Sequence, residues 1–307
     1  MHIPRVQPDT LPEPSPAPQR TLERLRVAFQ GEFGAFGEEA IHLLWRGAAE
    51  PIPKATFEDV MSAAESRDVD YGVLPIESTL GGGLDVAYDL LSLHDGLKIV
   101  AEVIVPVHLC LLAVPGATIK SLRTLASHPM MLGQCSHFLG RYKHITPQPA
   151  WDTAGAARDV RDSGDRTRAA AGTRRAAERF ELAVLMDHIE DRPDSQMRFL
   201  AVAREPAALT ENMPVRTALL AVFPHEAGAL VSALGPMAEA KFNISHLASR
   251  PTREPWRYQF FLEFEHTSGD PQVESALSAI RRATAEFRLL GTYPRWTKAA
   301  PEQTPQW

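Results

Sequence analysis

Between residue 25 and about residue 190 the chain alternates short apolar runs, typical of strands, with amphipathic runs typical of helices. LRVAFQ (25–30) is a strand-like run, followed by a glycine turn and a helical pattern from about Phe36. DYGVLPIE (70–77) repeats this order, with the helical run LDVAYDLLSL behind a second glycine turn. Such alternation predicts open α/β layers with crossover helices. Ligands of these sheets bind beyond the carboxyl ends of the strands, so the loops there are the first candidates for a site.

A polar, proline-bearing segment, EPAALTENMPV (205–215), interrupts this pattern and indicates a linker. Beyond it the expected order is β-α-β-β-α-β, with strands TALLAVF, NISHLASRP, WRYQFFLEFE and FRLLGTYP and helices GALVSALGPMAEAKF and PQVESALSAIRRATA. That order is the ferredoxin-like split βαβ unit. The sequence therefore predicts one α/β domain over residues 24–206, a linker over 207–215 and a second domain over 216–295.

Composition excludes several classes of function. The net charge of −6 over 307 residues gives no general attraction to nucleic acid or to anionic membranes, so an anionic ligand needs a local cluster of donors. No apolar stretch reaches the roughly 18–20 residues of a membrane span, and the N-terminus does not resemble a secretory signal. Cys110 and Cys135 form no close metal or redox motif. We expect them to be reduced, buried thiols of a cytoplasmic protein.

The two ends of the chain have a different composition. Residues 1–20 contain six prolines and show no apolar periodicity, which predicts a disordered tail over residues 1–23. The segment 296–307 is expected to be a second tail.

Two glycine loops follow predicted strands. GEFG (31–34) joins a strand to a helix, so its backbone N–H groups are suited to an anion, although a GxxG at this place is often only a tight turn. PIESTLGGG (75–83) adds a carboxylate and two hydroxyls, from Glu77, Ser78 and Thr79. These residues serve equally well as a ligand site or as a cap on the following helix.

Two further polar loops lie where strands give way to helices. In SHPMMLGQC (127–135), a structural hydrogen bond is the simplest role for His128, and Gln134 faces either a cleft or the core. In WDTAGAA (151–157), Thr153 is at a predicted helix N-terminus, which is also how a hydroxyl is directed at a ligand carboxylate. Each loop is ordinary alone, but together they indicate a site.

Six motifs follow one another along the predicted α/β domain: VAFQGEFGAFGEEA, YGVLPIESTLGG, SHPMMLGQC, DTAGAA, AAAGTRRAAERFEL and MRFLAVARE. Their order and spacing resemble the prephenate dehydratase family, and the resemblance covers roughly residues 25–294. GALV (228–231) and ASRP (248–251) look like the two phenylalanine-binding motifs of that family's ACT regulatory domain. The longest runs are most similar to bacterial and plant prephenate/arogenate dehydratases that lack a fused chorismate mutase.

The resemblance implies a dehydratase domain of two α/β lobes around a cleft, arranged like a type II periplasmic binding protein. Lobe 1 would hold about residues 24–104 and 195–206, lobe 2 about 105–194, and the ACT domain 216–295. It also implies conversion of prephenate to phenylpyruvate, water and CO₂ in L-phenylalanine biosynthesis. Neither a metal nor an organic cofactor would take part. Feedback inhibition by phenylalanine and assembly into a homodimer or homotetramer are further family expectations.

Motif by motif, the resemblance implies a catalytic set of Glu77, Ser78, Thr79, Gln134, Thr153, Met197, Arg198 and Phe199. It implies an allosteric phenylalanine site of Gly228, Ala229, Leu230, Val231, Ser249, Arg250 and Pro251. Prephenate carries two carboxylates, and a guanidinium can pair with a carboxylate through two parallel hydrogen bonds. We therefore expect Arg198 to face the cleft, together with backbone N–H groups of the glycine loops.

The chain departs from the family's motifs at four positions. Met197 replaces the Thr of Thr-Arg-Phe, Ser78 replaces an Asn, Met130 replaces a Gln, and Ala248 replaces the Glu of the second regulatory motif. A thioether cannot donate a hydrogen bond, and loss of one positioned donor typically lowers a rate by about 10²–10³. Three hypotheses follow: an active prephenate dehydratase, an arogenate dehydratase, or an impaired homologue that binds phenylalanine or prephenate. In the active case, Ser78, Thr79 or Thr153 would donate in place of Met197.

Overall fold

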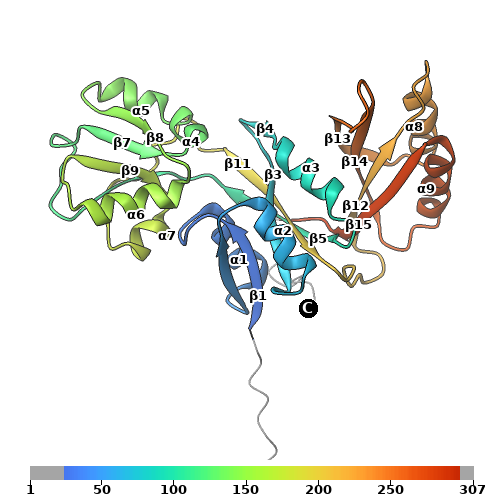
Figure 1. The fold of residues 1–307 in the computed structure, drawn as a ribbon, viewed down its shortest axis with the longest axis horizontal. Coiled ribbons are helices and arrows are strands. Elements are labelled where there is room, and N and C mark those ends of the chain that lie inside the picture. Colours follow the sequence, from blue (N-terminus) through green and yellow to red (C-terminus); the bar gives the residue numbers. More distant parts are fainter. Residues whose placement is uncertain (1–23, 298–307) are drawn as a thin grey trace, which may run out of the picture.

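Three sheets with their own helices make up residues 24–297, the part of the chain that the computed structural model describes (Figure 1). The sheet of lobe 1 lies between the sheet of lobe 2 and the sheet of the C-terminal domain. The predicted tail over residues 1–23 lies outside the described residues, as do residues 298–307 of the second one. Among the described helices none has both the length and the apolar character needed to cross a bilayer.

The sheet of lobe 1 has the strand order β2-β1-β3-β11-β5, with the short β4 beside β3. Its strands are β1 (Leu25–Gln30), β2 (Ala49–Lys54), β3 (Tyr71–Ser78), β4 (Gly82–Gly83), β5 (Lys98–Pro106) and β11 (Gln196–Ala203). Its helices are α1 (Phe36–Trp45), α2 (Phe57–Glu65) and α3 (Asp85–Leu93). The sequence did not predict β2, whose two prolines, Pro51 and Pro53, are tolerated because β2 is an edge strand.

The sheet of lobe 2 has the order β10-β6-β9-β7-β8. Its strands are β6 (Cys110–Ala113), β7 (Thr124–Ser127), β8 (Thr146–Pro149), β9 (Arg168–Gly172) and β10 (Ala183–Met186). Its helices are α4 (Pro129–Gly133), α5 (Ser136–Arg141), α6 (Thr153–Ser163) and α7 (Arg174–Arg179). Both cysteines belong to this lobe and are free and buried, as predicted.

The C-terminal domain is a four-stranded antiparallel sheet of order β13-β14-β12-β15. Its elements are β12 (Pro214–Val222), α8 (Ala229–Glu239), β13 (Asn243–Pro251), β14 (Tyr258–Thr267), α9 (Gln272–Ala283) and β15 (Glu286–Pro294). The predicted βαββαβ order is confirmed, and so is the α/β class of the whole chain.

The chain passes between the lobes twice, through residues 107–109 and 187–195, and these two crossover segments lie side by side. The N–H of Val107 donates to the carbonyl of Ser195 at 2.8 Å, and the N–H of Ile189 donates to the carbonyl of Leu109 at 2.9 Å. The crossovers are thus bonded to each other at the joint between the lobes.

Strand β11 is buried on both faces and separates two cores. Phe199 and Ala201 pack in a core shared with α1 and lobe 2, whereas Leu200 and Val202 pack in a core shared with α2, α3 and the C-terminal domain. Because side chains alternate along a strand, neighbouring residues of β11 meet different parts of the molecule. The C-terminal domain also packs closely on β5, since a side chain at Gly291 of β15 would overlap the carbonyl of Ile99.

Candidate active site

A cavity of about 510 Å³ lies between the two lobes, where the predicted loops meet. Lobe 1 contributes the start of α1 and parts of β3 and β11, and lobe 2 contributes the starts of α4 and α6. The apolar part of its wall includes Phe36, Met130, Met131, Met197 and Phe199. Its size and position suit a small ligand enclosed by both lobes.

Four helices of nine or more residues begin at this cavity, namely α1, α2, α3 and α6, and α1 and α6 start on opposite lobes. Ala35 precedes α1 without a side-chain cap, and Phe36 and Gly37 of its first turn line the cavity. Asp152 caps α6 by accepting the N–H of Gly155 at 2.8 Å. Because the first four N–H groups of a helix have no partner within it, the uncapped start of α1 favours an anion, whereas the Asp152 carboxyl group already occupies N–H groups at the start of α6.

The charged groups of the cavity wall are acidic. Glu58 and Asp152 belong to it, and within residues 24–297 neither a lysine nor an arginine does. Burial raises the pKa of Asp152, although hydrogen bonds from backbone N–H groups oppose that change. Asp152 was not among the predicted site residues, but the Asp-Thr that opens the helical run TAGAA was the signal for it.

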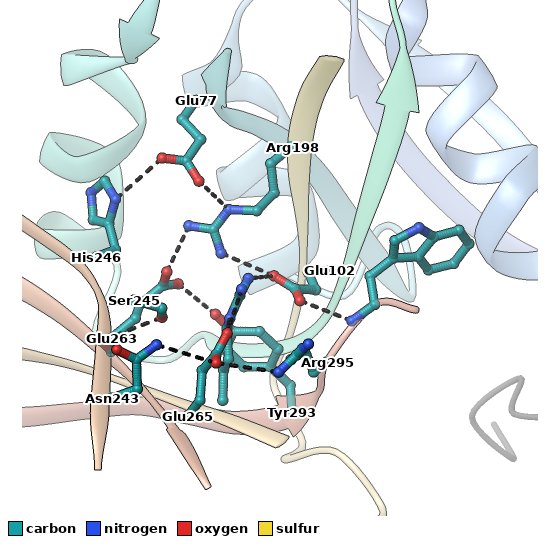
Figure 2. A network of polar contacts seen from close by, with 12 residues as sticks. Glu77, Glu102, Arg198, Asn243, Ser245, His246, Glu263, Glu265, Tyr293 and Arg295 are labelled. Atoms are coloured by element: carbon teal, nitrogen blue, oxygen red, sulfur yellow. Dashed lines mark hydrogen bonds and ion pairs between the residues drawn. The ribbon is translucent and has the colours of Figure 1, made fainter. Parts of the chain in front are cut away.

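Arg198 does not face this cavity, and the expectation that it would is wrong for this structure. Its neighbours Met197 and Phe199 line the cavity, so the alternation of β11 turns Arg198 to the opposite face. Its Nε donates to Glu77 at 2.6 Å, and its two Nη groups donate to Glu102 at 2.9 Å and Glu263 at 2.6 Å (Figure 2). Glu263 belongs to β14, so Arg198 connects β11 to the C-terminal domain.

The surrounding polar network spans both domains (Figure 2), and its centre, formed by Arg198, Glu102 and Glu263, is buried. Arg216 of β12 donates to Glu102 at 2.6 Å, and the Tyr293 hydroxyl donates to Glu263 at 2.5 Å. Burial alone would lower the pKa of Arg198, but the carboxylate of Glu263 and its other partners outweigh burial and raise it. Arg198 is therefore a permanent cation of the domain interface.

Glu77 also belongs to this network and not to the cavity wall. His246 of β13 lies 3.2 Å from its Oε2 and bonds at 2.7 Å to the hydroxyl of Tyr88 on α3. The hydrogen bond from His246 lowers the pKa of Glu77 to about 2; burial opposes this shift and the charge of Arg198 adds to it. Glu77 is thus ionised and held between the two domains.

Three other predicted site residues are not part of the cavity wall. The Ser78 hydroxyl accepts the N–H groups of Leu80 and Gly81, each at 3.4 Å. Thr79 and Gln196 bond to each other, with the Gln196 N–H 3.0 Å from the Thr79 hydroxyl. Gln134 accepts the Ser195 hydroxyl at 3.0 Å, while its Nε2 is buried without a partner. Of the predicted hydroxyls, therefore, Thr153 is the one in the cavity wall.

Three of the departures from the family's motifs lie next to one another. Met197 and Ser78 are direct partners across β11 and β3. Met130 and Ser78 both lie beside Gly81, where an added Cβ would stand 3.3 Å from the Met130 sulfur. Two of these residues line the cavity, so the substitutions together make one wall of it less polar.

The predicted phenylalanine site is divided between two elements of the C-terminal domain. Gly228 has a left-handed φ of 85° and precedes α8, whose first residues are Ala229, Leu230 and Val231; Val231 is 75% exposed. Ser249, Arg250 and Pro251 end β13. Arg250 is already paired, with Asp85 at 2.6 Å and with both oxygens of Asp89 at 2.9 and 2.8 Å, so it binds α3 of lobe 1.

Each of the two domains matches the sequence model of a known family. The sequence model described as "Prephenate dehydratase" matches residues 27–207, and the one described as "ACT domain" matches residues 222–282. The curated arogenate dehydratase 3 of Arabidopsis thaliana, a chloroplastic protein, is 35% identical over 306 residues, which cover 94% of this chain and 71% of that one.

Two solved structures are similar over nearly the whole described part. A prephenate dehydratase from Arthrobacter aurescens, solved in complex with L-Phe, has a TM-score of 0.82 and 26% identity, covering 92% of this chain and 94% of its own. GqqA, described as a novel type of quorum quenching acylase, has a TM-score of 0.81 and 30% identity, covering 88% and 98%. Because the family model matches residues 27–207 and the curated relative is 35% identical, this chain belongs to the prephenate dehydratase family; it also carries a C-terminal ACT domain.

Proposed function

We propose that this protein converts prephenate to phenylpyruvate, water and CO₂ in L-phenylalanine biosynthesis. The reaction expels a ring hydroxyl as a carboxylate leaves as CO₂, and aromatisation drives it. The enzyme therefore needs to orient the substrate, donate a hydrogen bond to the departing oxygen and exclude water. The observation that carries the proposal is the inter-lobe cavity, which offers uncapped N–H groups of α1 and a hydroxyl on the first turn of α6.

The anion-binding role that we expected of Arg198 passes, in this proposal, to the start of α1. Phe36 and Gly37 supply N–H groups there without a side-chain cap, whereas Asp152 already accepts the N–H of Gly155 at the start of α6. Glu32 of the loop before α1 is ion-paired with Arg158 of α6, which holds the two helix starts at a common cavity.

For the leaving hydroxyl we propose Thr153 as the hydrogen-bond donor. Its side chain is in the cavity wall and 5% exposed, whereas Ser78 and Thr79 already bond to backbone groups outside it. We expect Thr153→Val to lower kcat by about 10²–10³, the usual loss for one positioned donor, and Thr153→Ser to retain most of it. Equal rates for the two variants would overturn this role.

The test of the whole proposal is a turnover assay with both family substrates. Purified protein is given prephenate or arogenate, and phenylpyruvate or phenylalanine is measured, with heat-treated protein as the blank because acid alone aromatises prephenate. Product from prephenate supports the proposal, and product from arogenate alone identifies an arogenate dehydratase. Absence of both products, with phenylalanine or prephenate still bound in calorimetry, identifies the impaired binding homologue.

We also propose feedback regulation by L-phenylalanine through the ACT domain. Gly228 and the first turn of α8 offer N–H groups for its carboxylate. The route to the cavity would be β11, because Arg198 bonds Glu263 of the ACT domain and its neighbour Met197 lines the cavity. We expect millimolar phenylalanine to raise the Tm, and no shift would refute a functional site.

The assembly is proposed to be a homodimer or homotetramer formed by ACT domains edge to edge. Strand β13 is an edge of its sheet, and its Leu247 is 43% exposed, which supports pairing with a second copy. Light scattering of the purified chain tests this, since a monomer would contradict it. The cytoplasmic location that we expect is supported by the free, buried thiols of Cys110 and Cys135.

One observation favours a second candidate function. The relative described as a quorum quenching acylase is 30% identical, and in this chain Met130, Met197 and Phe199 form an apolar wall that suits an acyl chain. The reaction would be hydrolysis of an N-acyl amide to a carboxylic acid and an amine. A panel of N-acyl amides of rising chain length, followed by mass spectrometry, tests it. Cleavage without prephenate turnover would favour this alternative.

A further inference from the structure

A second cluster of chemically active side chains lies at the crossovers between the lobes. His108 is on the first crossover segment, and His188 and Glu190 are on the second. Both Nδ1 atoms lie near the same carboxylate oxygen of Glu190, at 3.2 Å for His108 and 2.9 Å for His188. One ligand atom from each residue lies within 4.8 Å of the others. The cluster belongs to none of the sites described above.

Two imidazoles and one carboxylate are a usual ligand set for zinc and its neighbours among the divalent transition metals. With metal–ligand bonds of about 2.0–2.1 Å, neighbouring ligand atoms stand roughly 3.0–3.5 Å apart. The two separations from Glu190 are at or near this range. All three ligand atoms lie within 4.8 Å of one another, so side-chain movements would let the three groups share one ion.

The carboxylate is held in place for such a role. The side chain of Glu190 is 1% exposed, and its other oxygen accepts the N–H of Leu109 at 2.8 Å. A hydrogen bond of this kind fixes a ligand carboxylate and leaves its second oxygen for a metal. Nearby Asp187 is engaged elsewhere, with Arg174 at 2.5 Å and the Cys110 thiol at 3.2 Å.

The imidazoles, by contrast, are open to solvent. The side chains of His108 and His188 are 48% and 63% exposed and lie in the wall of a separate cavity of about 520 Å³. His188 also has a left-handed φ of 55°, which is uncommon for a residue with a Cβ. Strained residues of this kind concentrate at ligand-binding positions, where the surrounding structure holds them.

We propose that His108, His188 and Glu190 bind one divalent transition-metal ion of the zinc class, with its remaining positions open to water from the cavity. Each imidazole binds through Nδ1 and keeps its proton on Nε2. Because the ligands come from both crossovers, the ion ties these segments together at the joint between the lobes. Its role is separate from the proposed dehydration, for which the family resemblance implies no metal.

The test is metal binding by the full chain, with any affinity tag removed and chelator dialysed away. Titration with ZnCl₂ in a calorimeter should give one ion per chain, and CoCl₂ should give the visible absorption bands of a nitrogen- and oxygen-bound ion. His108→Asn and His188→Asn should each weaken Zn²⁺ binding at least tenfold, since an amide is a poor substitute for imidazole. Asparagine suits position 188 because it tolerates a left-handed φ.

The matched control is His137→Ala, which removes an 84% exposed histidine that contacts Asp191 on the same crossover. This variant should bind Zn²⁺ as the unchanged chain does. The wild-type titration decides the proposal even if a variant fails to fold. No saturable binding at one ion per chain, or equal binding by the His108→Asn/His188→Asn double variant, would overturn it. Both readouts are independent of turnover, so failure of the proposed reaction leaves the metal site testable.

Discussion

The two faces of β11 meet opposite environments. On one face Met197 and Phe199 line a cavity whose wall has no cationic side chain among the described residues. On the other face Arg198 joins carboxylates from β3, β5 and the ACT domain in a buried network (Figure 2). Arg198, which lies between two cavity-lining residues in the sequence, thus connects the domains and does not face the cavity. Under the proposed function, binding in the cavity would therefore rely on the start of α1 and on the shape of the cavity.

The largest effect is expected on the interface face. Arg198→Met leaves the 1% exposed Glu263 without its cation and removes one of the two cationic partners of Glu102, which keeps Arg216. Removing one partner from a buried charge pair typically costs about 3–5 kcal/mol. Urea unfolding followed by circular dichroism measures it, with Arg257→Met, at an exposed pair with Glu254, as the control expected to lose less than about 1 kcal/mol. Equal losses would show that the network contributes no more than a surface pair.

The next effect is expected on the cavity face. Met197→Thr places a hydroxyl in the cavity wall, where the family's motif has one, and should raise kcat on prephenate by up to about 10²–10³. Stability should change far less than with Arg198→Met, because the network behind the strand is untouched. Steady-state kinetics measure the gain, and Met197→Val, of similar shape without a hydroxyl, is the control. An unchanged or lower kcat would count against a catalytic deficit at this position.

A smaller effect is expected on how the stability of the folded chain depends on pH, through Glu77 at the domain interface. Glu77 has a folded pKa of about 2, below its ordinary 4.5, so its ionised form is favoured by folding. The stability that it contributes is present above about pH 4.5 and is lost as the pH falls toward 2. Tm measured between pH 2.5 and 6 should therefore fall less steeply for Glu77→Gln than for the unchanged chain. If Tm fell equally steeply with pH in both proteins, the domain interface would not stabilise the ionised form of Glu77.

The smallest effect is expected at the exposed edge of the same interface. Asp89 is 43% exposed and pairs with Arg250 of β13, so Asp89→Asn should cost about 0.2–1 kcal/mol. Asp162→Asn, at an exposed pair in lobe 2, is the matched control. If phenylalanine inhibition also weakens in Asp89→Asn alone, this pair takes part in coupling the domains. Inhibition that stays unchanged would restrict coupling to the buried network.

Much of the fold could be predicted from the sequence because its signals are local. The strand at LRVAFQ begins and ends where the pattern predicts, the helix after it starts at Phe36, and the ACT order was read from periodicity alone. Strand β2 could not be predicted, because its prolines are acceptable only at a sheet edge.

The orientation of Arg198 could not be predicted, for a different reason. Residues 197–203 are all buried, so no alternation of apolar and polar side chains marks which face of β11 meets the cavity. Its partner Glu263 lies 65 residues further along the chain, and no local pattern announces that contact. The motif resemblance identified the correct strand, but it did not indicate on which face of that strand the side chain of Arg198 lies.

The alternation along β11 has a consequence for insertions and deletions. A slip of one residue in this strand would exchange its faces, sending the guanidinium toward the ligand and a thioether among the buried carboxylates. Loss of a single residue just before position 197 would thus damage recognition and domain docking at once. The length of the second crossover is therefore under tighter constraint than the identity of most residues in it.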